Sequence, residues 1–169
     1  MLSINRLLTK TSHKLIFATF LSVVFLLITA VTRSSVRQAG GLACFFIAGI
    51  LVLSVIKVVF LEFVEDEEKK AKGRKILEFL HASFGWIALI LVIYHSLYFL
   101  TLAFFPENNI SPNYFITGAL ALIPMGLVVV SGLDKNITVR KKVAKSMYFN
   151  HLAMAVLLAV LTVIHINFQ

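Results

Sequence analysis

The stretch His81-Ala-Ser-Phe-Gly-Trp-Ile-Ala-Leu-Ile-Leu-Val-Ile-Tyr-His95 places two histidines fourteen positions apart in one apolar run. A second apolar run repeats this interval between His151 and His165. In an α-helix, residues fourteen positions apart lie within about 40° of each other around the axis and about 21 Å apart along it. Each run therefore predicts a helix with two histidines on one face. Two such helices side by side would form two pairs of imidazoles, stacked across a membrane.

The composition predicts an integral membrane protein. Of 169 residues, 59% are hydrophobic and only 14% are charged, which lies outside the range of soluble globular domains. The net charge is +8, but the basic residues lie between apolar runs, which fits membrane topology better than nucleic-acid binding. The single cysteine, Cys44, and the absence of a C-x-x-C-H motif exclude covalent c-type haem attachment, an internal disulfide and an iron–sulfur cluster held by this chain alone.

Five apolar runs predict an all-α bundle of five transmembrane helices, forming a single domain over residues 1–169. The predicted spans are about 15–32, 41–61, 76–103, 113–133 and 147–168. We expect the first run to be a retained anchor and not a cleaved signal peptide, because it is long for one and no small-x-small cleavage site follows it.

Polar and helix-breaking residues mark the parts between and within these runs. Lys57, near the end of the second run, is expected to direct its ammonium toward the interface. The charged segment 62–75 is expected to be a solvated, partly helical connection, with a docking surface for a soluble partner as the alternative. The segment 105–112 predicts a turn closed by two prolines. Within the fourth run, glycines and a proline indicate a kink or close helix packing in preference to a binding site: Gly118, Pro124, Gly126 and Gly132.

The distribution of lysine and arginine predicts the orientation. Thirteen of them lie in the N-terminal segment and the second and fourth loops, whereas only Arg33 and Arg37 lie on the other side. The positive-inside rule then places the N-terminus in the cytoplasm and the C-terminus outside, and we expect the inner (cytoplasmic) membrane of a bacterium. The third and fifth helices run in the same direction, so the cytoplasmic layer holds His81 and His151, and the outer layer holds His95 and His165.

Histidines at membrane depth are costly unless they are paired or bound to something. Two neutral imidazoles from facing helices can hold the iron of a haem from both sides, which predicts two b haems, one for each layer. The residue four positions after each cytoplasmic histidine is small, Gly85 and Ala155, and leaves room for the macrocycle, although small residues also serve helix packing. Zinc is disfavoured, because each layer offers two histidines and no carboxylate.

The anionic propionates of such haems need cations or hydrogen-bond donors. The candidates are Arg74, Lys75 and Lys145 on the cytoplasmic side, and Tyr98, Asn108, Tyr114 and Asn167 on the outer side. His13 has no partner at the fourteen-residue interval and is interpreted as an interfacial residue.

The chain resembles the ferric reductase-like transmembrane family, which includes NADPH oxidases and bacterial haem membrane subunits. The matching features, over about residues 76–168, are Leu80-His81-x-x-x-Gly85 running on to His95, and Asn150-His151 running on to His165. The resemblance implies two b haems that pass electrons from a cytoplasmic flavin or NAD(P)H-oxidising module to an outer acceptor. The sequence has neither a sixth apolar run nor a glycine-rich dinucleotide fingerprint. We therefore expect a separate redox subunit, or quinol, to supply the electrons.

Two alternatives stay open. The first is a structural or assembly subunit of a membrane complex, without haem, whose histidines form hydrogen bonds between helices. The second is a quinone-reactive membrane anchor with a single haem. In the favoured interpretation the chain is an electron-transfer subunit of an oxidoreductase complex and not a complete enzyme, and no catalytic residue is predicted.

Overall fold

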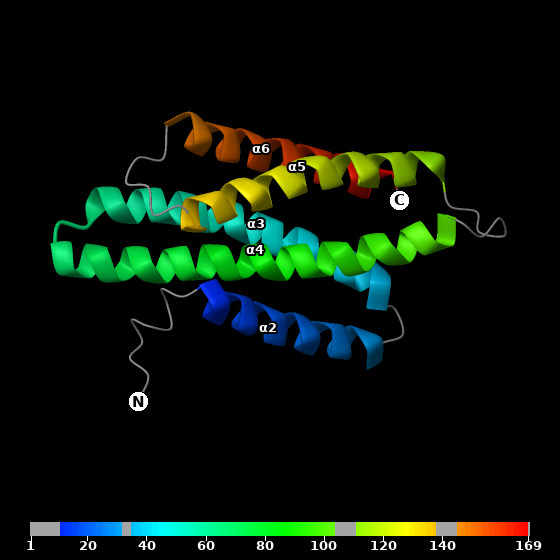
Figure 1. The fold of residues 1–169 in the computed structure, drawn as a ribbon, viewed down its shortest axis with the longest axis horizontal. Coiled ribbons are helices and arrows are strands. Elements are labelled where there is room, and N and C mark those ends of the chain that lie inside the picture. Colours follow the sequence, from blue (N-terminus) through cyan, green and yellow to red (C-terminus); the bar gives the residue numbers. More distant parts are fainter. Residues whose placement is uncertain (1–10, 32–34, 104–110, 138–144, 169) are drawn as a thin grey trace. The chain divides into compact units, whose positions relative to one another are not determined.

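The computed structural model describes residues 11–31, 35–103, 111–137 and 145–168, and these residues are almost entirely helical. Figure 1 shows five α-helices in the described part: α2 (Thr11–Val31), α3 (Ser35–Phe63), α4 (Glu67–Ala103), α5 (Pro112–Ile137) and α6 (Lys145–Asn167). The predicted all-α fold is confirmed. The predicted turn at 105–112 and most of the basic loop after α5 lie outside the described residues.

Four of these helices, α3 to α6, contain segments long and apolar enough to cross a membrane. Only 11% of the apolar window of α3 and 6% of that of α6 is buried within the protein. Such continuous apolar surface belongs against lipid and not against water. The described helices therefore indicate a multi-pass integral membrane protein. In α2, which corresponds to the first predicted span, the described apolar part is the shorter segment His13–Ile28.

The charged connection between α3 and α4 is shorter than the sequence indicated. Only residues 64–66 are non-helical, so most of segment 62–75 belongs to the two helices. Asp66 begins α4 by accepting hydrogen bonds at Oδ1 from the backbone N–H groups of Lys69 and Glu68, both at 3.0 Å. Hydrogen bonds from Lys69 and Glu68 hold the pKa of Asp66 below its usual value.

The helices group into two compact units, one reaching to His95 and the other starting at Ser96. In the first unit, α3 and α4 form an antiparallel hairpin and α2 packs against both (Figure 1). Phe17 lies against Phe79, with ring centroids 5.5 Å apart, and Phe25 lies against Phe46 at 5.4 Å. Small side chains such as Ala18 and Ala43 are fully or almost fully buried, which allows the close helix approach typical of membrane proteins.

The second unit contains the antiparallel pair α5 and α6 and the last two turns of α4. Phe99 of α4 contacts Tyr114 of α5, with ring centroids 5.3 Å apart. Helix α5 begins with Pro112, which suits the first helical position because its missing N–H has no acceptor there. Pro124 lies inside α5 and is fully buried.

Candidate functional site

The four predicted ligand histidines lie on two helices, one in each unit. His81 and His95 are on α4, and His151 and His165 are on α6. Both helices are continuous between their histidines, so each pair keeps the predicted spacing of about 21 Å along one face. All four side chains are partly buried. In every case the ring nitrogen Nδ1 lies within hydrogen-bond distance of an oxygen on the preceding helix.

In the first unit, the partners of the histidines come from α3. Nδ1 of His95 lies 3.0 Å from the backbone oxygen of Val36. A carbonyl oxygen can only accept, so this Nδ1 carries the hydrogen and donates it. Nδ1 of His81 lies 3.4 Å from Oγ of Ser54. The Ser54 hydroxyl donates its single hydrogen to the backbone oxygen of Ile50 at 2.9 Å, so toward His81 it can only accept.

In the second unit, α5 provides the same arrangement to α6. Oγ of Ser131 lies 2.9 Å from Nδ1 of His151 and donates its hydrogen to the backbone oxygen of Leu127 at 2.7 Å. Oγ1 of Thr117 lies 3.1 Å from Nδ1 of His165 and donates to the backbone oxygen of Asn113 at 2.8 Å. With its hydrogen directed to its own helix, each hydroxyl can accept a hydrogen bond from the imidazole.

These contacts favour one tautomer. At His95 the carbonyl partner requires a hydrogen on Nδ1, and at the other three histidines the hydroxyl's bond to its own helix favours the same state. With Nδ1 protonated and donating, the lone pair of a neutral ring is on Nε2. A metal-binding histidine that coordinates through Nε2 needs this tautomer, and an acceptor at Nδ1–H also holds the ring in one orientation and raises its basicity.

Glycines on the preceding helices face three of the four rings. A Cβ added at Gly40 would lie 2.7 Å from Cε1 and Nδ1 of His95, and one at Gly118 would lie 3.1 Å from Cε1 of His165. At Gly132 the corresponding distance to Cε1 of His151 is 3.5 Å. The close packing predicted for two glycines of α5 is therefore present, and the group packed against them is a histidine ring.

The other predicted site residues have varied surroundings. A Cβ at Gly85 would meet no described heavy atom within 4 Å, which agrees with open space beside α4, while Ala155 is partly buried. Tyr114, a candidate propionate donor, instead stacks on the ring of His165, with centroids 4.3 Å apart and an interplanar angle of 26°. The amide of Asn167 donates to its own helix at Val163, at 2.8 Å. The side chains of Asn108 and Lys145 lie outside the described residues.

Lys57 has a specific partner within the first unit. Its Nζ donates to Oε1 of Glu78 at 2.9 Å, and the side chains are 27% and 46% exposed. The pair lies one helical turn from Ser54 on α3 and from His81 on α4. The sequence predicted only that Lys57 would reach for the interface, and it did not link Lys57 to Glu78.

Sequence reasoning identified the histidines but missed the residues that hold them. These are Val36 and Ser54 on α3, and Thr117 and Ser131 on α5. A signal exists for the α5 pair, because Thr117 and Ser131 are also separated by fourteen residues. Antiparallel helices with the same rise per residue keep matching intervals in register, so the interval on α6 recurs on its neighbour.

Two histidines could hold a haem, whereas a metal ion held by protein alone needs a larger group of ligands. Among the described residues, no group of three or more histidine, cysteine or acidic side chains lies together as a metal site requires. A haem needs only two axial side chains, because the macrocycle supplies the other four donors. Comparisons with protein-family models, with curated proteins and with solved structures give no match for this chain.

Proposed function

We propose that the chain is a diheme b-type cytochrome subunit that carries electrons across a membrane. His81 and His151 would hold the inner haem, and His95 and His165 the outer haem. The observation that carries the proposal is the shared Nδ1 contact: each histidine has Nδ1 within hydrogen-bond distance of an oxygen on the preceding helix, which favours the tautomer with a lone pair on Nε2. Four histidines that only joined helices would be under no requirement to use the same nitrogen.

The chemistry supplied by bound haem is a one-electron Fe(III)/Fe(II) couple. The chain's own residues would set the conditions for it. The imidazoles would hold the iron, the Val36 carbonyl and the hydroxyls of Ser54, Ser131 and Thr117 would orient the rings, and the apolar helices would exclude water. With the two histidines of each helix about 21 Å apart along its axis, one layer lies toward each side of the bilayer.

The proposal includes the finer topology. The apolar helix α2 is the first of five spans, the N-terminus is cytoplasmic and the C-terminus is outside, because thirteen of the sixteen lysines and arginines then lie on the cytoplasmic side. The membrane is the inner membrane of a bacterium. The resemblance to the ferric reductase-like transmembrane family suggests a cytoplasmic flavin or NAD(P)H-oxidising subunit, or quinol, as donor, with an acceptor outside.

Haem content tests the proposal. A pyridine-haemochrome assay of the purified chain should give two b haems, and the reduced-minus-oxidised spectrum should show their α-bands. The variant His95→Ala should keep one haem, whereas His13→Ala, which changes the one histidine outside the two pairs, should keep both. A colourless wild-type protein that is folded and inserted in membranes would refute the proposal. A single haem in the wild type would favour the quinone-reactive anchor.

A structural subunit is the second candidate, and the same contacts favour it. Hydrogen bonds such as Ser131 to His151 join adjacent helices, and in membranes each contributes about 0.6 kcal/mol on average. This function predicts a colourless protein in which alanine at any of the four histidines still assembles. The tautomer argument ranks it below the cytochrome, because joining helices requires only a hydrogen bond and not a lone pair on Nε2.

A further inference from the structure

Three charged side chains meet at one end of the first unit, each from a different helix. They are Lys14 of α2, Lys57 of α3 and Glu78 of α4, named here the charged cluster. Nζ of Lys57 lies 2.9 Å from Oε1 of Glu78, and Glu78 also attracts Lys14 electrostatically. With both lysines protonated, the charged cluster contains two cations and one carboxylate.

The burial of Lys14 argues against a purely interfacial lysine. A lysine that only extends from an apolar helix into water leaves its ammonium well exposed. Lys14 is 7% exposed, and it lies on the same face of α2 as the buried residues Ala18 and Ser22. An excess charge in an environment of this kind is costly unless an anion compensates it. The charged cluster is therefore suited to take a further anion.

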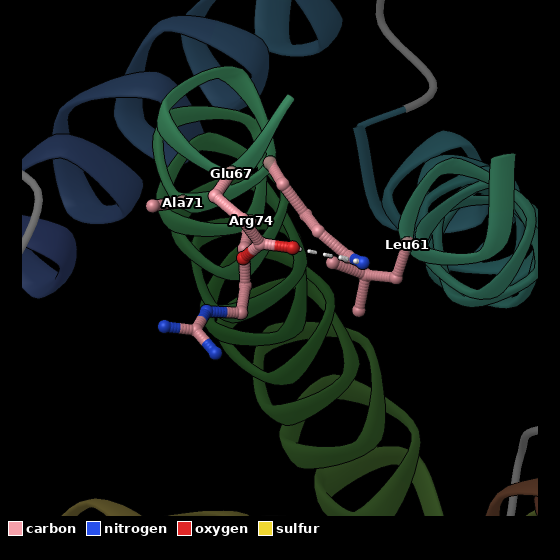
Figure 2. A pocket seen from close by; sticks show the side chains of 5 residues that line it. Leu61, Glu67, Ala71 and Arg74 are labelled. Atoms are coloured by element: carbon pink, nitrogen blue, oxygen red, sulfur yellow. Dashed lines mark ion pairs between the residues drawn. The ribbon is translucent and has the colours of Figure 1, made fainter. Parts of the chain in front are cut away.

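A hollow of about 120 Å³ lies at the corner where α3 ends and α4 begins, and its lining includes Leu61 and Arg74, one helical turn from Lys57 and Glu78. Figure 2 shows Leu61 of α3 across from Glu67, Ala71 and Arg74 of α4. Within it, the one carboxylate already pairs with a lysine, Glu67 with Lys70 at 3.5 Å. Arg74 lies one turn before Glu78 on α4. The hollow thus has apolar residues, Leu61 and Ala71, beside a cation, Arg74, and an amphiphilic ligand needs both kinds of contact.

We propose that the charged cluster and this hollow bind the phosphate headgroup of an anionic phospholipid in the cytoplasmic leaflet. Lys14 lies in the first turn of the apolar part of α2, and Lys57 and Glu78 lie near the cytoplasmic ends of their spans, at the level of lipid headgroups. Large apolar side chains within two positions of them in the sequence are exposed and could contact acyl chains: Ile16 at 66%, Val58 at 63% and Ile76 at 41%. The inference rests on the orientation in the proposed function but not on its haems.

Thermal unfolding in a neutral detergent tests the site. Added phosphatidylglycerol should raise the unfolding midpoint more than phosphatidylcholine does, because a ligand that binds only the folded state stabilises it. Lys14→Gln and Lys57→Gln should each weaken the apparent affinity for phosphatidylglycerol about fivefold. Glu78→Gln removes the carboxylate from the charged cluster and should tighten the binding of phosphatidylglycerol. Lys69→Gln is the control, since this lysine is 79% exposed and pairs with Asp66 outside the charged cluster.

The opposite signs expected for the lysine and glutamate variants make the proposal falsifiable. Equal midpoint shifts with the two lipids, or a Lys14→Gln variant that matches Lys69→Gln, would overturn it. An equal shift with inorganic phosphate would show a site for free anions and would overturn the lipid assignment. If Glu78→Gln does not fold, Lys14→Gln still decides, because it leaves the Lys57–Glu78 ion pair intact. Accessibility of Lys69 to a membrane-impermeant reagent in sealed vesicles reports the orientation, and so separates failure of this site from failure of the proposed topology.

Discussion

Replacing Ser131 by alanine tests directly whether the hydrogen bonds at Nδ1 position haem ligands. At 2.9 Å, the bond from His151 to Ser131 is the shortest of the four. The substitution leaves Nδ1–H of His151 without its hydroxyl acceptor in an apolar setting and frees the ring to turn. A neutral hydrogen bond contributes about 1 kcal/mol net, and loss of a residue that orients a metal ligand typically weakens metal binding about 10- to 100-fold.

We expect Ser131→Ala to bind the inner haem about tenfold more weakly, which corresponds to about 1.4 kcal/mol, and to leave the outer haem unchanged. The contact distances also rank the variants. Thr117→Val should have a smaller effect at the outer haem, because its bond to His165 is 3.1 Å long, and Ser54→Ala the smallest, at 3.4 Å. The assay is titration of the haem-free protein with haem, followed in the Soret band.

Two matched variants complete the test. Ser131→Thr keeps the hydroxyl and should bind both haems as the wild type does. Thr101→Ala removes a hydroxyl that bonds only to the backbone of its own helix, at Tyr98, and should have no effect on haem binding. If Ser131→Ala binds the inner haem with wild-type affinity, or loses both haems equally, the positioning role assigned to this bond is wrong.

Two further predictions concern the backbone around α3 and α4. Gly40→Ala should lower outer-haem occupancy, because its Cβ would lie 2.7 Å from the His95 ring. Gly41→Ala is the control, since its Cβ would meet nothing within 4 Å, and it should retain both haems. Equal absorption spectra for the two variants would contradict this prediction. Asp66 has a lowered folded-state pKa, so its stabilisation of α4 is present above its unfolded pKa of about 3.9 and is lost as the pH falls through the lower folded value. Hydrogen exchange at the amides of Glu68 and Lys69 should therefore accelerate in that acid range in the wild type but not in Asp66→Asn. If exchange in Asp66→Asn accelerates with acid as it does in the wild type, the carboxylate of Asp66 is not the group responsible.

The sequence predicted the helices well because one physical requirement dominates them. Apolar runs such as 76–103 must satisfy their backbone within the helix when they lie in lipid. The ends of the helices were less predictable. Helix α4 begins at Glu67 and not near residue 76, because Asp66 caps it and the following charged residues tolerate a helix in water. Hydropathy marks the part of a helix that lies in lipid and does not reveal an extension beyond it.

The candidate site was only half predictable, for a related reason. A histidine in an apolar run stands out because its burial is costly, so His81 and His165 are visible in the sequence alone. Serine and threonine do not stand out, because their hydroxyls can bond to their own helix, as Ser131 does with Leu127. Whether such a hydroxyl also accepts from a histidine depends on the packing of two helices. Glycine is ambiguous in the same way, because it is found both where a helix bends and where two helices pack closely.

The spacing of the histidines determines which polar residues can face them. On α5 the hydroxyls that face the histidines of α6 belong to Thr117 and Ser131, and on α3 the groups that face those of α4 are the Ser54 hydroxyl and the Val36 carbonyl. A residue that contacts a histidine must lie at the level of that histidine, whether the ring holds a haem or only joins two helices. The interval of fourteen on α5 therefore follows from the interval on α6, and haem content is the measurement that separates the cytochrome from the structural subunit.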